Sequence, residues 1–378
     1  MSNAQRGDGV GAPLRVLHIN SSISRRSGVM SVVMNYFRNV DRSRVVFDFC
    51  YYAADGGPDY EEEILGLGGR CLSLGAGRHA LRIRSRLAAL LAGNPGEYAI
   101  AHLHDPALTR LIHPVVRGHG VNTLIVHSHA TEYSDHMYGR FRNRLACRRI
   151  ADHCEAQFAC SRAAGEFLFG SDGFELIPNA VDVNTYGFQP KVRSAARIRL
   201  GLNGAFVVGH VGRFSPQKNH RSLIPIFNEI CRMRGDARLL LVGDGPLRTT
   251  VEKQVAELGL DGRVDFLGNR LDVPELYQAM DVMVLPSLYE GLPMVGVEAQ
   301  CSGLPLVCAD TVSREVGIGD CSFLSLNASP GEWAREVGRL TTAARPRATG
   351  PERIRAAGYD VEIAAAGLAD KYRTLAGS

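Results

Sequence analysis

The sequence contains no long apolar run and no closely spaced cysteine pair. None of its apolar runs approaches the roughly 18 residues that a membrane-spanning helix needs, and the polar, glycine-rich first dozen residues lack the apolar core of a signal peptide. The nine cysteines are odd in number, form no Cys-x-x-Cys pair and often lie in apolar runs. This pattern is typical of reduced, buried thiols and predicts a cytoplasmic protein with a disordered N-terminal tail.

Lysine is scarce and a zinc motif is absent. Only four lysines occur, Lys191, Lys218, Lys253 and Lys371, and the other basic residues are arginines. The net charge of +4 indicates no particular partner, and we expect none among nucleic acids. His153, Cys154 and Cys160 are close together, but their spacing fits no standard zinc site, so no metal is expected.

Short apolar runs alternate with helical patterns along the whole chain. A length of 378 residues suggests two domains. In the first half we expect strands over 14–19, 45–52, 98–103, 124–127, 157–160 and 175–177, and helices over 29–40, 60–67, 78–91, 106–117 and 138–154. In the second half we expect strands over 206–211, 237–242, 264–267, 281–285 and 306–309, and helices over 222–233, 247–258, 273–280 and 293–303. This alternation predicts an α/β fold of two doubly wound, Rossmann-like domains, with a turn-rich linker at 182–191.

The segment 286–299 is the most informative part of the sequence. Glu290 and Glu298 are eight positions apart, and Pro293 between them suits the start of a helix. Glu290 would lie on the turn after a buried strand. Glu298 would lie just over one turn into the helix that follows. Free N–H groups at this helix start favour a phosphate, and the two carboxylates suit sugar and ribose hydroxyls. The residues therefore predict a sugar-nucleotide site.

The same segment carries a resemblance to a known family. Glu-x7-Glu after Pro286-Ser287, followed by Gly303-Leu304-Pro305, resembles glycosyltransferase family 4, whose members are retaining enzymes of the GT-B fold. The resemblance implies an acceptor-binding domain at 13–185, a nucleotide-sugar-binding domain at 186–358, and a final helix in 359–378 that packs back on the first domain. Ligands of such folds bind beyond the carboxyl ends of the strands, here between the two domains.

Two cations follow the first strand of the second domain. Arg213 and Lys218 lie in a segment similar to the Gly-Arg-x4-Lys element of the family. An arginine can bind two phosphate oxygens at once and a lysine supplies a compact charge, so the pair suits a diphosphate leaving group. The resemblance also implies that the donor contacts Gly291, Leu292, Pro293, Met294 and Val295.

Two further elements of the second domain match the family less specifically. Gly243 lies in a Gly-Asp-Gly-Pro turn that is near the nucleotide in the family, but a structural tight turn explains it equally well. Leu267 belongs to a segment whose backbone contacts the base in the family.

In the first domain the resemblance implies roles for Gly28 and His129. Gly28 belongs to the loop that approaches the donor, with Ser27 in place of the usual first glycine. His129 corresponds to a histidine that faces the donor sugar, and a purely structural role is the alternative. His104 and Asp105 end another strand and are acceptor-side candidates.

An arginine-rich stretch lies between His136 and Ile150. It contains five arginines, no acidic residue and the interleaved apolar Phe141 and Leu145. Such a helix could bind an anionic membrane surface, or it could be a solvated face; the sequence leaves both open. The expected location is the cytoplasm, with peripheral attachment to the inner membrane face as the finer alternative.

The prediction is a retaining glycosyltransferase with catalytic residues Glu290, His129, Arg213 and Lys218. It would move a sugar from a nucleoside diphosphate, taken to be UDP, to a glycan acceptor linked to polyprenyl diphosphate, in bacterial exopolysaccharide or capsule synthesis. The resemblance implies that no protein carboxylate acts as nucleophile. No cofactor beyond the nucleotide sugar is expected, and no Asp-x-Asp metal motif occurs. The alternatives are a sugar-nucleotide epimerase of the same fold and a non-catalytic nucleotide-binding scaffold.

Overall fold

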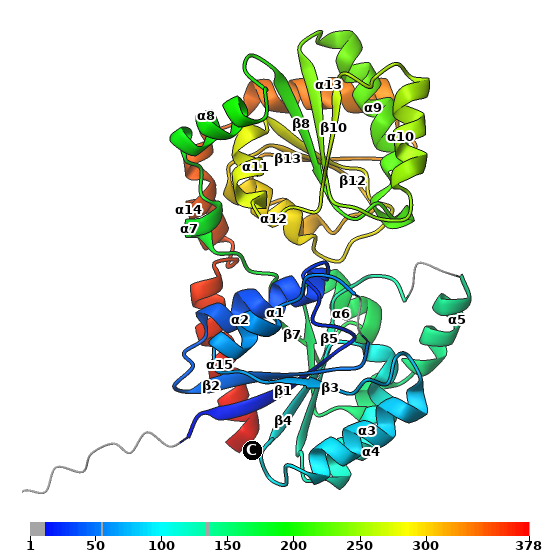
Figure 1. The fold of residues 1–378 in the computed structure, drawn as a ribbon, viewed down its shortest axis with the longest axis vertical. Coiled ribbons are helices and arrows are strands. Elements are labelled where there is room, and N and C mark those ends of the chain that lie inside the picture. The colour runs from blue at the N-terminus through cyan, green and yellow to red at the C-terminus, as the bar shows by residue number, and fades with distance from the viewer. Residues whose placement is uncertain (1–11, 54–55, 134–136, 378) are drawn as a thin grey trace, which may run out of the picture.

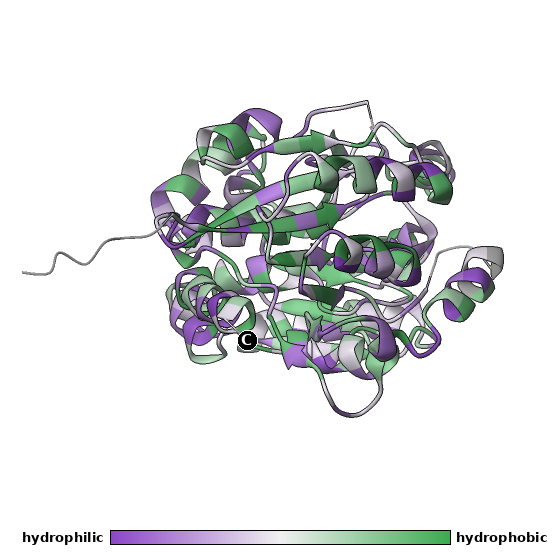
Figure 2. Cartoon of the chain, turned by 90° about the horizontal axis from the view of Figure 1, so that it is seen from below, coloured by the Kyte–Doolittle hydropathy of each residue, from purple (hydrophilic) through white to green (hydrophobic). Residues whose placement is uncertain are grey.

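The structure is a computed structural model that describes residues 12–53, 56–133 and 137–377. It contains two parallel β-sheets, each with helices on both faces, stacked one above the other in Figure 1. In Figure 2 the strands of both sheets are mostly hydrophobic and the outer helices carry the hydrophilic residues. The prediction of two doubly wound α/β halves is confirmed.

The first sheet has seven strands in the order β3-β2-β1-β4-β5-β6-β7, all parallel. The strands are β1 Leu14–Asn20, β2 Val45–Tyr51, β3 Cys71–Ser73, β4 Ile100–Leu103, β5 Thr123–Ser128, β6 Ala156–Ala159 and β7 Glu175–Leu176. The helices are α1 Gly28–Asn39, α2 Glu61–Gly66, α3 Ala80–Ala92, α4 Thr109–Gly118, α5 Met137–Ala146 and α6 Arg162–Phe169. Alternate residues of the strands belong to two separate apolar clusters, one on each face of the sheet.

The second sheet has six parallel strands in the order β10-β9-β8-β11-β12-β13. The strands are β8 Phe206–Val211, β9 Ala237–Val242, β10 Val264–Gly268, β11 Val282–Leu285, β12 Leu306–Ala309 and β13 Cys321–Leu324. The helices are α7 Val183–Tyr186, α8 Pro190–Arg199, α9 His220–Met233, α10 Arg248–Glu257, α11 Val273–Ala279, α12 Met294–Cys301, α13 Pro330–Ala343 and α14 Gly350–Ala356. Because β8 and β11 are neighbours, the loops that follow them meet at one edge of the sheet.

The last helix returns to the first sheet. Helix α15, Val361–Gly377, packs against α1 and β4. The hydroxyl of Tyr372 lies 2.6 Å from Nδ1 of His102, and Arg44 forms a 2.8 Å ion pair with Asp370. The chain therefore crosses between the two halves twice. The first crossing precedes β8, the first strand of the second sheet, and the second follows β13, its last strand.

The expected helix over 138–154 and the expected linker differ most from the structure. The helix expected over 138–154 ends at Ala146, because Arg149 has a left-handed backbone (φ 52°) that a right-handed helix cannot include; a short 3₁₀ turn, Ile150–His153, follows. The linker segment 182–191 is also more ordered than its composition suggests. Asp182 caps α7 by accepting from the N–H groups of Asn184 and Thr185, and Pro190 begins α8.

Candidate active site

The centre of the site is an ion pair between two loops at the carboxyl edge of the second sheet. Lys218 ends the 3₁₀ turn Pro216–Lys218 after β8, and Glu290 follows β11. Lys218 Nζ lies 2.5 Å from Glu290 Oε1, and Gln217 Nε2 donates to Oε2 at 3.3 Å. Both charged side chains are largely enclosed, 15% and 10% exposed. A partly buried ion pair of this kind is stabilised by mutual attraction and is available for exchange with a charged ligand.

The two loops are fixed to each other by backbone geometry. Asn219 has a left-handed backbone (φ 52°), a conformation that asparagine tolerates better than most residues, and its Nδ2 donates to the carbonyl of Pro286 at 3.0 Å. Leu288 N donates to Gln217 O at 2.8 Å. These bonds fix the relative positions of the two loops that carry Lys218 and Glu290.

Glu298 lies within α12 and is held by two tyrosines. Tyr277 donates to Oε2 at 2.7 Å and Tyr186 to Oε1 at 3.1 Å. Burial raises the pKa of Glu298, and the tyrosine hydrogen bonds oppose that shift. Sequence reasoning found the glutamate but not the tyrosines, which come from α11 and α7 and carry no motif.

The start of α12 faces the first domain. Pro293 is the N-cap, and the N–H groups of Met294 and Val295 have no backbone acceptor among the described residues. A Cβ atom on Gly291 would lie 3.0 Å from the carbonyl oxygen of His129. Asn179 Nδ2 donates to Leu292 O at 2.7 Å. The turn between Glu290 and α12 is thus in direct contact with the loop that follows β5.

The other predicted donor-side residues each lie at or beside the end of a strand or helix. Gly243 has φ +130°, and a Cβ there would come within 2.2 Å of the carbonyl oxygen of Gly212, so packing of the chain's own loops requires glycine. Leu267 is partly buried in β10. Arg213 is exposed and makes no ion pair among the described residues. Gly28 opens α1, which Ser27 caps, and a Cβ there would meet no atom within 4 Å.

Five histidines line one face of the first sheet, and the last of them, His129, lies in the loop that contacts the turn before α12. His129 Nε2 lies 2.9 Å from His104 Nδ1, and His104 Nε2 lies 2.9 Å from His18 Nδ1. In a second contact, His127 Nδ1 lies 3.2 Å from His102 Nε2. Burial lowers the pKa of His129 to about 4 and that of His18 to about 3, so these imidazoles are neutral at pH 7. Sequence reasoning named His129 and His104 singly; the repeated His-x-His spacing in two strands was the signal for a shared face.

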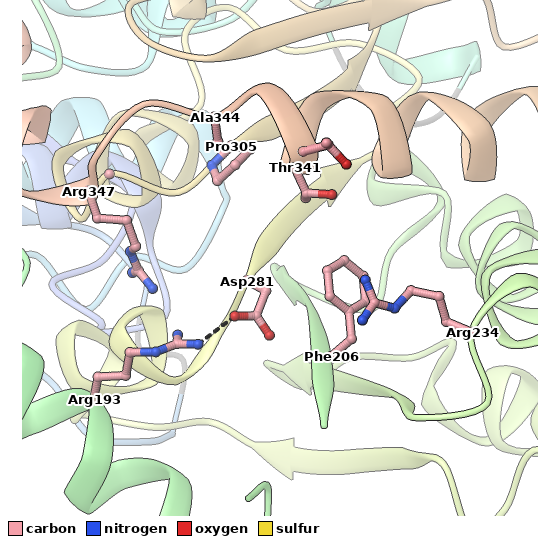
Figure 3. A pocket seen from close by; sticks show the side chains of 10 residues that line it. Arg193, Phe206, Arg234, Asp281, Pro305, Thr341, Ala344 and Arg347 are labelled. Atoms are coloured by element: carbon pink, nitrogen blue, oxygen red, sulfur yellow. Dashed lines mark hydrogen bonds and ion pairs between the residues drawn. The ribbon is translucent and has the colours of Figure 1, made fainter. Parts of the chain in front are cut away.

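A separate cavity of about 380 Å³ lies away from this site (Figure 3). Its lining includes Phe206, Asp281 and Pro305, which begin or precede strands, so it lies at the amino edge of the sheet. Arg193 binds Asp281 at 2.5 Å, and Arg347 donates to the carbonyl oxygens of Ser302 and Met280. These arginines are used to tie helix ends and loops together, and ligands of doubly wound folds bind at the opposite edge.

Comparison with known proteins decides the family. Residues 205–343 match the family model of glycosyl transferases group 1. The protein named "Putative glycosyltransferase EpsF" from Bacillus subtilis (strain 168) is 34% identical over 372 residues, which cover 95% of this chain and 96% of the relative. This chain is a family 4 glycosyltransferase.

Two further similarities concern particular parts and the fold. A GDP-mannose-dependent alpha-(1-6)-phosphatidylinositol dimannoside mannosyltransferase of Mycobacterium tuberculosis is 31% identical over 178 residues, 44% of this chain and 45% of that protein. The crystal structure of Anabaena Alr3699/HepE in complex with UDP and glucose superposes with a TM-score of 0.79 at 21% identity, over 95% of this transferase and 99% of that chain. The fold of the transferase is thus the GT-B fold.

Proposed function

We propose that this transferase moves a sugar from UDP to a glycan acceptor with retention of configuration, in bacterial exopolysaccharide or capsule synthesis. The observation that carries the proposal is the enclosed Lys218–Glu290 pair beside the start of α12, across from His129. On donor binding, Lys218 exchanges Glu290 for the diphosphate, and Glu290 receives hydrogen bonds from the hydroxyls of the sugar. Exposed Arg213 and the free N–H groups of α12 complete the diphosphate site.

Glu298 is assigned to the ribose. Each of its oxygens already accepts one tyrosine hydrogen bond, and a carboxylate oxygen can accept a second. Held between Tyr186 and Tyr277, the carboxylate has a fixed orientation, which reduces the entropy lost when a ribose hydroxyl binds.

Retention follows without a protein nucleophile. The family resemblance implies that no protein carboxylate acts as nucleophile, and here Glu290 is assigned to the sugar hydroxyls and Glu298, held by two tyrosines, to the ribose. We assign the acceptor's proton to the departing phosphate, on the same face of the sugar, while Lys218 and Arg213 stabilise the charge that develops there.

The choice of UDP and of a glycan acceptor can be tested together. Among the similar proteins, one structure contains UDP and glucose while several relatives are named as GDP-mannose-dependent. We propose a mass-spectrometric screen of sugar nucleotides, UDP-sugars and GDP-mannose, against membrane lipid extract. We expect a new glycoside only with a UDP-sugar; product from GDP-mannose alone would contradict the UDP assignment.

We predict that sugar transfer needs neither magnesium nor manganese. Lys218, Arg213 and the start of α12 already supply positive charge to the diphosphate, and the chain has no Asp-x-Asp. Initial rates measured with and without excess chelator should agree within about twofold, and added manganese should not raise them. Activity that disappears in chelator and returns with manganese would contradict the assignment of the diphosphate to protein groups.

Helix α5 is proposed to bring the transferase to a lipid-linked acceptor. Its Phe141 and Leu145 are 66% and 54% exposed, and Arg142 and Arg144 between them are exposed as well. Exposed apolar and basic side chains on one short helix suit the headgroup layer of an anionic membrane. The side chain of Arg140 lies outside the described ones, and Arg148 lies beyond the end of α5. No helix among the described residues is long and apolar enough to span a membrane.

We predict salt-sensitive binding of the full chain to anionic liposomes. Each arginine near such a surface contributes about 1 kcal/mol, so reversing Arg142 and Arg144 to glutamate should weaken binding by roughly 30-fold or more at low salt. The measurement is co-sedimentation at low and high salt. Reversal of Arg82 and Arg84, exposed on α3, makes the same charge change elsewhere and should have a smaller effect. Equal loss of liposome binding in both variants, or no sedimentation of the wild type, would show that α5 is a solvated helix and does not bind the membrane.

A further inference from the structure

The histidine face of the first sheet has more ring nitrogens than the transfer reaction uses. We propose that His104, His127 and His129 together bind one late first-row divalent cation, with zinc as the first choice. The ion would fix the ends of β4 and β5. It would not hold the donor diphosphate and shares only His129 with the site proposed above, and it departs from the metal-free expectation of the sequence.

The three ring nitrogens already converge. One nitrogen from each of His104, His127 and His129 lies within 4.8 Å of the other two. His104 Nδ1 and His129 Nε2 are 2.9 Å apart, and the rings of His127 and His129 stack with centroids 4.0 Å apart. Tetrahedral zinc with bonds of about 2.0–2.1 Å places its ligand nitrogens roughly 3.3 Å apart. Small ring movements therefore suffice to admit the ion.

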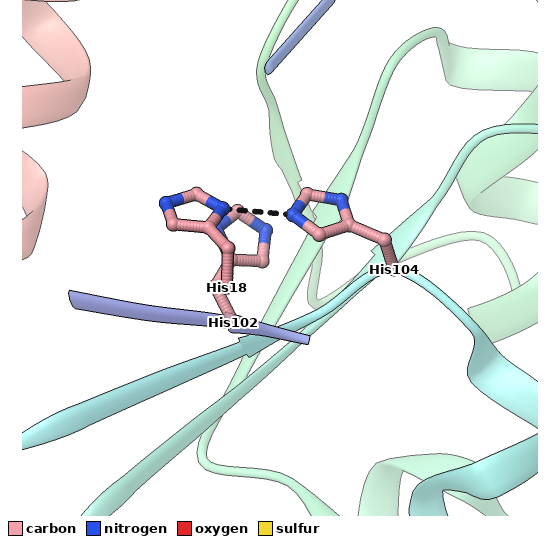
Figure 4. Close-up of side chains that lie close together, drawn as sticks. All are labelled: His18, His102 and His104. Carbon is pink, nitrogen blue, oxygen red and sulfur yellow. Dashed lines mark hydrogen bonds between the residues drawn. The ribbon is translucent and has the colours of Figure 1, made fainter. Parts of the chain in front are cut away.

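Two of the three proposed ligands have the outer hydrogen-bond partners that metal-binding histidines require. His104 Nε2 lies 2.9 Å from His18 Nδ1, and His127 Nδ1 lies 3.2 Å from His102 Nε2. Figure 4 shows the first of these contacts. If His104 and His127 each donate the outer N–H to the histidine behind, the other nitrogen of each presents a lone pair to the ion. His102 then donates through Nδ1 to the hydroxyl of Tyr372, at 2.6 Å.

One buried nitrogen lacks a partner at the proposed site. With Nδ1 of His127 bound to His102, its Nε2 remains, and this atom is buried without a hydrogen bond in the described structure. A buried nitrogen without a partner costs free energy, and a coordinated ion would satisfy it. Imidazole nitrogen without carboxylate favours zinc, copper, nickel and iron over magnesium and calcium.

A deeper trio of histidines, His18, His102 and His104, also converges (Figure 4). It is a weaker ligand set because both ring nitrogens of His102 are already engaged, one by Tyr372 and one by His127. Its His18 and His102 are also only 1% exposed. His129, by contrast, is only partly buried and follows the end of β5, which gives an ion a route of entry. The trio of His104, His127 and His129 is therefore the proposed site. His18 and His102 are its supporting hydrogen-bond partners.

Metal titration of the full-length, tag-free protein tests the proposal. Wild-type protein stripped of metal should bind one equivalent of zinc by calorimetry. Cobalt, used as a spectroscopic probe, should give the strong visible absorption of tetrahedral nitrogen coordination. The variant His127→Asn should bind at least about 100-fold more weakly, whereas His153→Asn, a partly exposed histidine outside the group, should bind as the wild type does.

Two controls separate a binding defect from a folding defect. Circular dichroism checks the fold of each stripped variant, and His129→Gln, at the partly exposed rim, replaces His127→Asn if that variant does not fold. Zinc should raise the Tm of the wild type and of His153→Asn only. Absence of stoichiometric binding by the wild type, or binding that both ligand variants retain at full strength, would overturn the proposal.

Discussion

Glu290→Ala and Lys218→Ala should each lower kcat by about 100-fold or more while the protein stays folded. Both side chains lie at strand ends on loops, and neither fills a core position. Removal of a preorganised group that contacts the sugar or the leaving diphosphate costs about 3 kcal/mol of transition-state stabilisation. Each variant also leaves the other charge without its partner, so the two losses should not add in the double variant.

Steady-state rates of UDP release in the presence of acceptor give the measurement. Lys253→Ala and Glu257→Ala change the same residue types on the exposed face of α10 and should keep wild-type rates. Melting temperatures within a few degrees of the wild type would confirm that the fold survives. Near-wild-type transfer by both site variants would show that the ion pair is structural and that the donor binds elsewhere.

Glu298→Gln should raise KM for the donor by about 10- to 100-fold, with a smaller effect on kcat. A hydrogen bond to a charged group contributes roughly 1.5–3 kcal/mol, and a ribose hydroxyl is remote from the reacting bond, so the loss falls mainly on binding. Glutamine keeps the size of the side chain in this buried position, which limits the effect on folding.

Donor titrations at saturating acceptor separate the two constants. Tyr277→Phe and Tyr186→Phe remove the groups that orient Glu298 without touching the carboxylate itself, and each should raise KM by a smaller factor. A change of kcat with KM unaltered in Glu298→Gln would move this residue from the ribose to the reacting centre.

Sequence patterns predicted the elements that contain the site well. The strands 206–211, 237–242 and 306–309 agree with β8, β9 and β12 residue for residue, because buried parallel strands are short apolar runs bounded by turn residues. The meeting of Lys218 and Glu290 could be expected in outline, since carboxyl ends of parallel strands share one edge of a sheet.

Other features depended on contacts between distant segments. Tyr186 is 112 residues from Glu298 in sequence, and no local pattern marks it as a partner. The break at Arg149 arises from a single left-handed residue, which arginine gives no reason to expect. The histidine group required the registers of β1, β4 and β5, which fix whether side chains from three strands share a face.

Whether the transferase retains the anomeric configuration is read from the stereochemistry of its first product. The measurement is proton NMR of the anomeric signals during the reaction of a UDP-sugar with acceptor, recorded before any slow anomerisation. We expect equal amounts of free UDP and of a new glycoside with the anomeric configuration of the donor. A glycoside of inverted configuration, or an isomerised sugar nucleotide without release of UDP, would contradict it.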